Sequence, residues 1–420
     1  PSDIQIKALP IIMDKKDLLK LLDNVQEDGD DTVKDKRVLL RTDYNVPIQD
    51  SVVIDDYRIK KSLPIIRYCI DQGASITIMS HLGRPKGYDE DYSLRPISKK
   101  LSDILGKEII FSDDCVSDKA FVASSSLEKG QIHMLENLRF HSGELDNCSD
   151  FSRLLSFHGD VYINDAFGTV HRSHASNLGV VTFFNEKSMG FLMEKELKFL
   201  KHEVQNPLRP FVVVMGGAKI KGKIELVENF LNESDYLLIG GALSFPFLKV
   251  KGVNISSPLI NNEDLKYAEK LLSLAKKQNK KIIFPTDFVT ASSLDDIDSI
   301  DIQLIENISP NVYCFDIGPE TTMLFSQILS QAETILWNGP LGVSENPYFG
   351  TGTQQVCRII EELTNNGVIS ILGGGDTASA ARKFSQNEKF SHISTGGGAS
   401  LELLSGKELP ALKILGYYDK

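Results

Sequence analysis

Short apolar runs recur along this chain of 420 residues, and most of them are continuous rather than alternating. Continuous runs are typical of strands that are covered on both faces of a parallel sheet. Stretches of helical period, such as residues 264–277 and 354–364, lie between them and complete an α/β pattern. The predicted strands are residues 38–42, 75–79, 132–135, 161–164, 211–215, 236–239, 281–284, 334–337 and 369–372.

Nearly every predicted strand is followed at once by a polar or glycine-rich segment. Ligands of open α/β sheets bind at the carboxyl ends of the strands, so we expect the chemistry in these segments. The length predicts two or three domains. Residues 185–207 are charged, amphipathic and long for one helix, which is expected of a helix that bridges two domains or of an ordinary surface helix.

Composition excludes several classes of protein. A net charge of −11 disfavours broad binding to nucleic acids or anionic membranes, which needs a basic face. No apolar run approaches the ~18 residues of a membrane span, and the first residues do not follow the pattern of a secretory signal. Five scattered cysteines fit reduced thiols, so we expect a cytoplasmic protein.

Glycines and basic side chains are sorted to opposite ends of the chain. Adjacent glycines occur only beyond residue 210, whereas six of the eight histidines and nine of the twelve arginines lie before residue 175. Glycines let backbone N–H groups gather around a polyphosphate, and arginines clamp a small anion. The sorting predicts one half-site for a nucleotide and one for a small acidic substrate, the division expected of a kinase.

The candidate cations of the acidic half-site are Arg58, Arg84, Arg139 and Arg172. An acidic substrate that approaches a nucleotide is repelled, by about 4 kcal/mol for two unit charges ~4 Å apart, and fixed cations would offset this repulsion. An isolated loop arginine is more often a solvated charge. His171 and His174 with Asp165 also allow a metal site, which we weigh below anion binding because no further ligand is obvious nearby.

The candidate phosphate loop is residues 216–223, directly after a predicted strand. It nearly matches a P-loop, but Ile224 stands where a hydroxyl residue would hold Mg²⁺. Lys219 and Lys223 would share one face of a first helical turn and reach toward phosphates, with a solvated lysine pair as the alternative. Residues 372–378 match a variant dinucleotide fingerprint. Asp376 and Thr377 lie where a helix would begin, and they would either bind Mg²⁺ and phosphate or cap that helix. If residues 373–378 bind a dinucleotide instead, the alternative function is a nicotinamide dehydrogenase.

Taken together, the motifs resemble the phosphoglycerate kinase family in their order, from about residue 36 to residue 410. The most specific are NDAFGTVHRSHAS at 164–176, WNGP at 337–340, GGGDTA at 373–378 and STGGGAS at 394–400. Others that agree are MGFLMEKEL at 189–197, IGGALSF at 239–245, FPTDFV at 284–289 and DIGPET at 316–321. Tyr44 and Ser344 depart from the family's usual Phe at both positions, and Gly222 from its common Asp.

The resemblance implies reversible phosphoryl transfer between ATP and the carboxylate of 3-phosphoglycerate, which gives 1,3-bisphosphoglycerate and ADP. It also implies Mg²⁺ with the nucleotide, a monomer that bends at a hinge, and two Rossmann-like domains, each a parallel sheet flanked by helices, joined by a long helix with a cleft between them. The expected boundaries are 1–187 plus 406–420 for the acid-binding domain, 188–204 for the helix and 205–405 for the nucleotide domain.

The resemblance also implies the residues of the site. The catalytic residues it implies are Arg58, Lys219 and Gly375, and the metal ligand is Asp376. For the acid substrate it implies Asp43, Asn45, Arg58, His81, Arg84, Arg139 and Arg172. For the nucleotide it implies Gly216, Gly217, Lys219, Lys223, Gly240, Gly241, Asn338, Glu345, Gly374, Gly375, Asp376 and Thr377, with Glu345 at the ribose.

Overall fold

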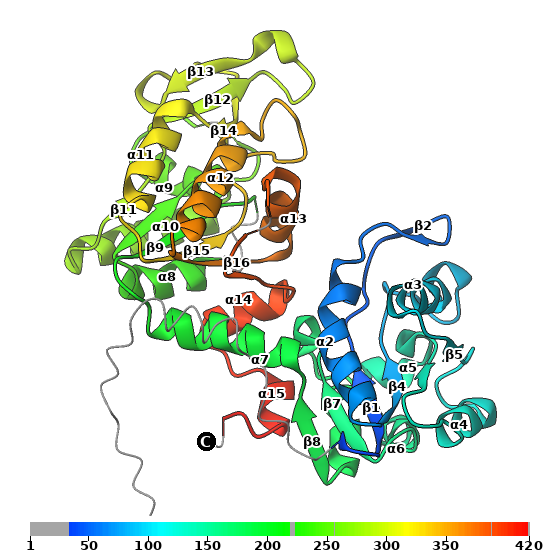
Figure 1. The fold of residues 1–420 in the computed structure, drawn as a ribbon. Helices are drawn as coiled ribbons and strands as arrows, with labels where there is room; N and C mark the ends of the chain where they lie inside the picture. Colours follow the sequence, from blue (N-terminus) through cyan, green and yellow to red (C-terminus); the bar gives the residue numbers. More distant parts are fainter. Residues whose placement is uncertain (1–32, 219–222, 256, 388, 419–420) are drawn as a thin grey trace, which may run out of the picture. The chain divides into compact units, whose positions relative to one another are not determined.

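The computed structural model describes residues 33–218, 223–255, 257–387 and 389–418. In these ranges the chain forms two six-stranded sheets in which every strand pair is parallel (Figure 1). Helices flank both sheets, as the continuous apolar runs predicted. Across the described ranges, no helix combines the length and the apolar character that a membrane crossing requires.

The first sheet has the order β5-β6-β4-β1-β7-β8. Its strands are β1 (Arg37–Arg41), β4 (Ser75–Met79), β5 (Ile109–Phe111), β6 (Ile132–Met134), β7 (Val161–Asn164) and β8 (Glu186–Met189). Its helices are α2 (Tyr57–Asp71), α3 (Arg95–Leu105), α4 (Asp118–Ser125), α5 (Ser142–Leu145) and α6 (Ser149–Ser156). The edge strands β5 and β8 are missing from the strands predicted from sequence, because they are short and largely polar or partly exposed.

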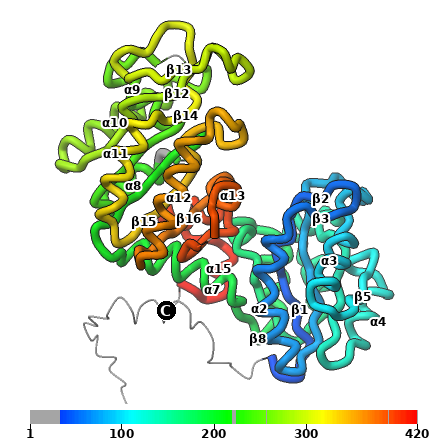
Figure 2. The backbone as a smooth tube through the Cα atoms, turned by 45° about the horizontal axis from the view of Figure 1, so that its top comes forward, coloured from blue at the N-terminus to red at the C-terminus, as the bar shows by residue number. Residues whose placement is uncertain are grey.

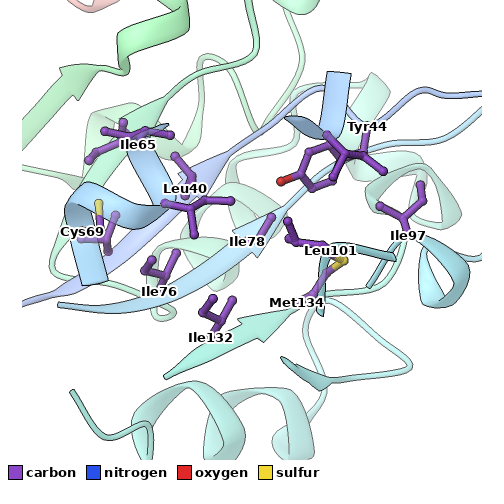
Figure 3. Close-up of a cluster of buried hydrophobic side chains, with 14 of the residues drawn as sticks. Leu40, Tyr44, Ile65, Cys69, Ile76, Ile78, Ile97, Leu101, Ile132 and Met134 are labelled. Carbon is purple, nitrogen blue, oxygen red and sulfur yellow. The ribbon is translucent and has the colours of Figure 1, made fainter. Parts of the chain in front are cut away.

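Successive residues of the central strands of this sheet point into two different cores. Leu40 of β1 packs with residues of α2 and α3, and Figure 3 shows it beside Ile65, Cys69 and Ile76. Its neighbour Leu39 packs instead against α4 and α6. Two buried faces leave little room for polar side chains within a strand, and this explains why the runs are continuous rather than alternating.

The second sheet has the order β11-β10-β9-β15-β16-β17. Its strands are β9 (Phe211–Met215), β10 (Tyr236–Ile239), β11 (Ile282–Ile283), β15 (Thr334–Asn338), β16 (Ile369–Gly373) and β17 (His392–Ile393). The helices are α8 (Ile224–Glu233), α9 (Phe245–Val250), α10 (Asn262–Lys277), α11 (Pro319–Leu329), α12 (Thr351–Asn365), α13 (Gly375–Phe384) and α14 (Gly398–Leu404). Trp337, the single tryptophan, is fully buried in the core under α11 and α12.

An antiparallel sheet of three strands that the sequence did not predict follows α10. Its order is β13-β12-β14, formed by Asp301–Leu304, Asp287–Ala291 and Tyr313–Ile317. Figure 2 shows the three strands together at the top of the trace, beside α9. A second small antiparallel pair, β2 (Ile48–Gln49) and β3 (Val52–Val53), follows β1.

The segment between the two sheets starts later than the predicted helix at 188–204. Residues up to Met189 belong to β8, which pairs with β7, and α7 (Phe191–Leu197) begins after Gly190. It runs directly into a π-helical stretch, Lys198–Glu203. Near the other end of the chain, α15 (Pro410–Ile414) donates a hydrogen bond from the Ala411 N–H to the carbonyl of Val170. The domain boundaries stay a prediction.

In each sheet the direction of strand addition reverses at one position. From β9 the chain adds β10 and β11 on one side, and β15, β16 and β17 on the other. In the first sheet β1 lies between β4, on the side of β5 and β6, and β7, on the side of β8. Loops that leave neighbouring strands on opposite sides of such a reversal diverge, so a ligand site is expected there at the carboxyl ends.

Two buried histidines lie close together, His133 in β6 and His158 between α6 and β7. The rings of His133 and His158 are 6.2 Å apart, and each ring has a nitrogen within 2.8 Å of a serine hydroxyl. Burial lowers the pKa of both imidazoles from the ordinary 6.5 to about 4, and the His158 ring adds to the effect at His133. The folded protein therefore holds both rings neutral at pH 5, where the unfolded chain protonates them.

We expect these two histidines to lower the free energy of unfolding as the pH decreases from 6.5 to 5, because the unfolded chain binds protons there that the folded protein does not. Each shifted histidine contributes about 2 kcal/mol over this window, at about 1.4 kcal/mol per pH unit. Urea titrations at a series of pH values measure the slope, and His158→Gln should flatten it. The exposed His202 provides the control, because His202→Gln should keep the wild-type slope. Equal slopes in His158→Gln and wild type would contradict the assignment.

Candidate active site

The end of β1 carries an arginine, Arg41, that was not among the candidate cations named from the sequence. Arg41 is fully buried, and its guanidinium donates to the Ser176 hydroxyl at 2.8 Å and to the carbonyl of Thr42. One guanidinium nitrogen lies 3.2 Å from Nδ1 of His81. A buried arginine at a strand terminus is expensive unless its donors have partners. Its place at the end of an otherwise apolar run was the signal in the sequence.

Around Arg41 the structure gathers the basic side chains that were predicted from loops far apart in the sequence. Nε2 of His81 lies 3.2 Å from the guanidinium of Arg172. Arg139 is buried and donates to the carbonyl of Gly83, and its Nε has no hydrogen-bond partner among the described residues. We call Arg41, Arg58, Arg84, Arg139, Arg172 and His81 the basic cluster.

The charges of the basic cluster act on one another. Burial, followed by Arg172 and Arg41, lowers the pKa of Arg139 to about 10. Burial lowers the pKa of His81 well below its usual range, and four arginines of the cluster add to this effect. The ring of His81 is therefore neutral. Burial is the larger cause of both shifts, and the arginines of the cluster add to it, as expected where positive charges lie close together.

Arg58, the second residue of α2, is held in two directions. Its Nη1 donates to the Asp43 carboxylate at 2.6 Å, and its Nη2 donates to the carbonyl of Thr395 at 3.1 Å. Thr395 lies in the loop between β17 and α14, and it is held in turn by Glu196 of α7. The buried Glu196 carboxylate accepts the N–H and the hydroxyl of Thr395 at 2.7 and 2.8 Å.

Asn45 and Arg84 complete the predicted acid-binding residues. The side-chain oxygen of Asn45 accepts the N–H of Gly83 at 2.9 Å, which ties the loop after β1 to the loop after β4. Arg84, next to Gly83, is exposed, and its charge contributes to the lowered pKa values of Arg139 and Arg172. All seven predicted acid-binding residues therefore lie in loops or first helical turns beyond the carboxyl ends of β1, β4, β6 and β7.

The glycine loops meet at the reversal point of the second sheet. The N–H of Gly216 donates to the carbonyl of Asn338 at 2.9 Å, and the N–H of Gly217 donates to that of Pro340 at 2.7 Å. A Cβ on Gly216 would collide with the Pro340 carbonyl, and one on Gly241 would lie 3.1 Å from it. Gly217 and Gly241 both have positive φ. These glycines are required because main chain packs directly on main chain.

The helix α13 begins where residues 373–378 were predicted to bind phosphate. Gly374 precedes it with φ of 95°, and a Cβ on Gly375 would meet nothing within 4 Å. Thr377 fastens this turn, because its hydroxyl donates to the carbonyl of Gly373 at 2.7 Å and accepts the N–H of Gly339 at 2.6 Å. The start of α13 therefore presents the N–H groups of a first helical turn beside open space, an arrangement suited to an anion.

The structure describes two of three further residues that were predicted to bind the nucleotide, Asn338 and Lys223, but not Lys219. The buried Asn338 side chain donates to the carbonyl of Gly373 at 2.9 Å, so it joins β15 to the start of α13. Lys223 lies at the N-cap of α8 rather than inside its first turn, and its Nζ donates to the carbonyl of Gly216 at 2.7 Å. Burial lowers the pKa of Lys223 to about 8, against the opposing effect of Asp376. Lys219 and Gly222 lie outside the described residues.

A cavity of about 510 Å³ lies against the glycine loops. Gly217, Gly241, Glu345 and Asp376 line it, whereas Gly240 lies behind, against Leu341. Much of the remaining lining is apolar and was missed by the sequence analysis: Phe245, Leu259, Phe288, Leu294, Tyr313 and Val343. Several of these residues come from the unpredicted antiparallel sheet or its loops. The cavity thus has a polar end and an apolar part, which fits a molecule with phosphates at one end and a flat ring at the other.

A second, smaller cavity of about 70 Å³ adjoins residues of both predicted half-sites. Asn45 and Arg58 line it from the acid-binding residues, and Gly375 lines it from the nucleotide-binding residues. Thr395, the partner of Arg58, also contributes. Arg58, which was predicted to be catalytic, therefore lines the same cavity as the helix start that was predicted to hold phosphate.

The donor set decides which metal the site could hold. Among the residues that the structure describes, no group of three His, Cys, Asp or Glu side chains could hold a metal ion. His171, His174 and Asp165 therefore do not form such a group. Asp376, in the first turn of α13, is a carboxylate on the wall of the larger cavity. A single carboxylate fits Mg²⁺ that arrives with a nucleotide, because Mg²⁺ usually combines one or two carboxylates with phosphate oxygens and water.

Comparisons with known proteins show which family the chain is similar to. A family model described as phosphoglycerate kinase matches residues 28–407. Phosphoglycerate kinase of Chloroherpeton thalassium is 43% identical over 381 residues, which cover 90% of this chain and 96% of that protein. That of Thermosipho africanus is 43% identical over 382 residues, 90% of this chain and 95% of that protein. The dehydrogenase alternative has no support among these relatives.

Solved structures lead to the same family. Phosphoglycerate kinase from Coxiella burnetii superposes with a TM-score of 0.82 at 36% identity, covering 93% of this chain and 98% of that one. The enzyme from Pyrococcus horikoshii gives a TM-score of 0.80 at 32% identity, with the same two shares of 93% and 98%. The match in sequence and in fold extends over nearly the whole chain, which therefore belongs to the phosphoglycerate kinase family.

Proposed function

We propose that this chain transfers a phosphoryl group reversibly between ATP and the carboxylate of 3-phosphoglycerate, in the glycolytic direction or its reverse. The observation that carries the proposal is the small cavity lined by both Arg58 and Gly375. A cation from the first half-site and the start of α13 from the second share one space there. That space is where a group passing from one substrate to the other would be.

The basic cluster fits the acid substrate by charge. Of its five arginines, two are offset by the carboxylates Asp43 and Glu144, which leaves three positive charges. A phosphate ester carries a charge of about −2 and a carboxylate −1 at neutral pH, so 3-phosphoglycerate would balance the cluster. Asn45 would add a polar contact. We assign the acid substrate to the loops after β1, β4, β6 and β7.

The glycine loops and α13 fit the nucleotide. In this assignment the phosphates lie at Gly216, Gly217 and the first turn of α13, with Lys219 and Lys223 as cations. The base enters the apolar part of the larger cavity, and the exposed Glu345 meets the ribose. Mg²⁺, held by Asp376 and the phosphates, would supply charge neutralisation on the phosphate oxygens. We propose a monomer for the working enzyme.

The reaction needs no general base. A carboxylate with a pKa near 4 is already ionised at pH 7 and can attack a phosphorus atom directly. Catalysis then depends on position and on stabilising the charge of the moving group. Arg58 performs this task in our proposal, since it lines the small cavity together with Gly375. A hinge motion that closes around both substrates would exclude the water that hydrolyses an acyl phosphate.

The test is to trap the product. Protein incubated with ATP, Mg²⁺, 3-phosphoglycerate and hydroxylamine should form a hydroxamate from the acyl phosphate. Arg58→Ala should lower kcat by about 10³-fold or more, the range known for arginines that stabilise a transferred phosphoryl group. Arg67, exposed on the same helix, provides the matched control, and Arg67→Ala should keep the wild-type rate. No hydroxamate from wild type would refute the function, and an Arg58→Ala rate within a few-fold of wild type would refute the role.

Asp376 provides a separate prediction about the metal. Asp376→Asn removes the charge but keeps the shape, so we expect it to weaken the binding of ADP in the presence of Mg²⁺ by roughly tenfold. Binding of ADP in the presence of EDTA should change little. Calorimetric titration of ADP under both conditions measures the difference. An equal loss of affinity with and without Mg²⁺ would show that Asp376 acts on the nucleotide itself.

A further inference from the structure

The first turn of α2 is attached to α13 by side chains that the proposed reaction does not use. Asp55, just before α2, accepts the N–H of Tyr57 at 2.9 Å with one carboxylate oxygen. The other oxygen forms an ion pair with Arg382 of α13 at 3.3 Å. One carboxylate therefore both starts the helix that carries Arg58 and binds the helix whose first turn holds Gly375.

Tyr57 adds two more links. The guanidinium of Arg382 lies 4.9 Å from the centre of the Tyr57 ring, within the range of a cation–π contact. The Tyr57 hydroxyl donates to the carbonyl of Ile393 at 3.2 Å. The ring thus lies between α13 on one side and β17, the strand that leads to Thr395, on the other.

These side chains surround the place of phosphoryl transfer. Asp55, Tyr57 and Arg382 line the same small cavity as Arg58 and Gly375. Arg382 follows Gly375 by seven residues, two helical turns, so both lie on one face of α13. Tyr57 directly precedes Arg58 in the first turn of α2. Fixing Tyr57 against Arg382 therefore fixes the distance between the backbone of Arg58 and the start of α13.

Such fixing matters because arginine side chains are long. The guanidinium of Arg58 is directed by Asp43 and by the carbonyl of Thr395, but its reach depends on where its Cα lies. A displacement of about 1 Å at a reacting centre can cost ~100-fold in rate. Arg382 is itself occupied by the Asp55 carboxylate and the Tyr57 ring. Its charge is offset, so its influence on the reaction passes through Arg58.

We propose that Asp55, Tyr57 and Arg382 form a positioning set, which holds Arg58 at the working distance from the phosphate-binding start of α13. The inference rests on the proposed function and adds to it. The set acts on the rate of transfer rather than on the affinity for either substrate, because none of its three members belongs to the basic cluster or the glycine loops. Arg382 and Tyr57 depend on each other, so losing one should remove most of what the other contributes.

The experiment measures kcat in the hydroxylamine assay, and the affinities for ADP and for 3-phosphoglycerate by calorimetry. Arg382→Gln and Tyr57→Leu should each lower kcat by about 10- to 100-fold, with both affinities within twofold of wild type. The double variant should be no slower than the slower single variant, since both disrupt one contact. Tyr57→Phe keeps the ring and should retain most of the wild-type kcat. Tyr57→Leu against Tyr57→Phe gives the same test if Arg382→Gln fails to fold.

Arg153 provides the matched control, because its guanidinium lies 5.8 Å from the Phe157 ring at an exposed position on α6. Arg153→Gln should keep the wild-type kcat. An unchanged kcat in Arg382→Gln and Tyr57→Leu would overturn the proposal. So would a loss of affinity for ADP or 3-phosphoglycerate as large as the loss of kcat, because Arg382 would then contact a substrate directly. Failure of wild type to form hydroxamate would instead refute the proposed function.

Discussion

An excess of fixed positive charge beyond the carboxyl ends of the first sheet is the constraint on which the rest of the site depends. Burial lowers the pKa values of Arg139 and Arg172, and the neighbouring arginines lower them further, because cations this close disfavour one another. They persist because the fold holds them: Arg41 is anchored by a serine hydroxyl and a carbonyl, and Arg139 by the carbonyl of Gly83. The free energy that this crowding costs is recovered when an anion binds, since a ligand that binds only the folded protein stabilises it.

The second half-site would hold its anion with backbone N–H groups rather than with a cluster of arginines. A triphosphate brought to another cluster of arginines would be held by flexible side chains, whereas the glycine loops offer backbone donors at fixed positions. Gly216, Gly217 and Gly241 make this possible because main chain packs on main chain around Pro340. The two half-sites adjoin one small cavity, where Arg58 and the start of α13 lie together. Side-chain cations supply charge on one side, and backbone geometry supplies position on the other.

The sequence predicted the parallel sheets, and it predicted site residues that the structure places in loops or first helical turns beyond the carboxyl ends of strands, because both depend on local signals. Continuous apolar runs mark strands buried on both faces, and loops after such strands mark the ligand edge, as Arg58, Arg172 and the residues 373–378 illustrate. Arg41 was missed because its importance comes from burial beside His81, a contact between residues 40 positions apart. The apolar lining of the larger cavity was missed because Phe288 and Tyr313 lie on short strands without a strong period, brought together only by tertiary packing.

Our central claim is that the acid substrate binds to the basic cluster and the nucleotide to the glycine loops, as separate half-sites. The most direct measurement is the midpoint temperature of unfolding of wild type and Arg172→Gln, with 3-phosphoglycerate or ADP added in turn. The account predicts that each ligand stabilises wild type, and that Arg172→Gln loses most of the shift from 3-phosphoglycerate while keeping the shift from ADP. No stabilisation of wild type by 3-phosphoglycerate, or an equal loss of both shifts in Arg172→Gln, would contradict it.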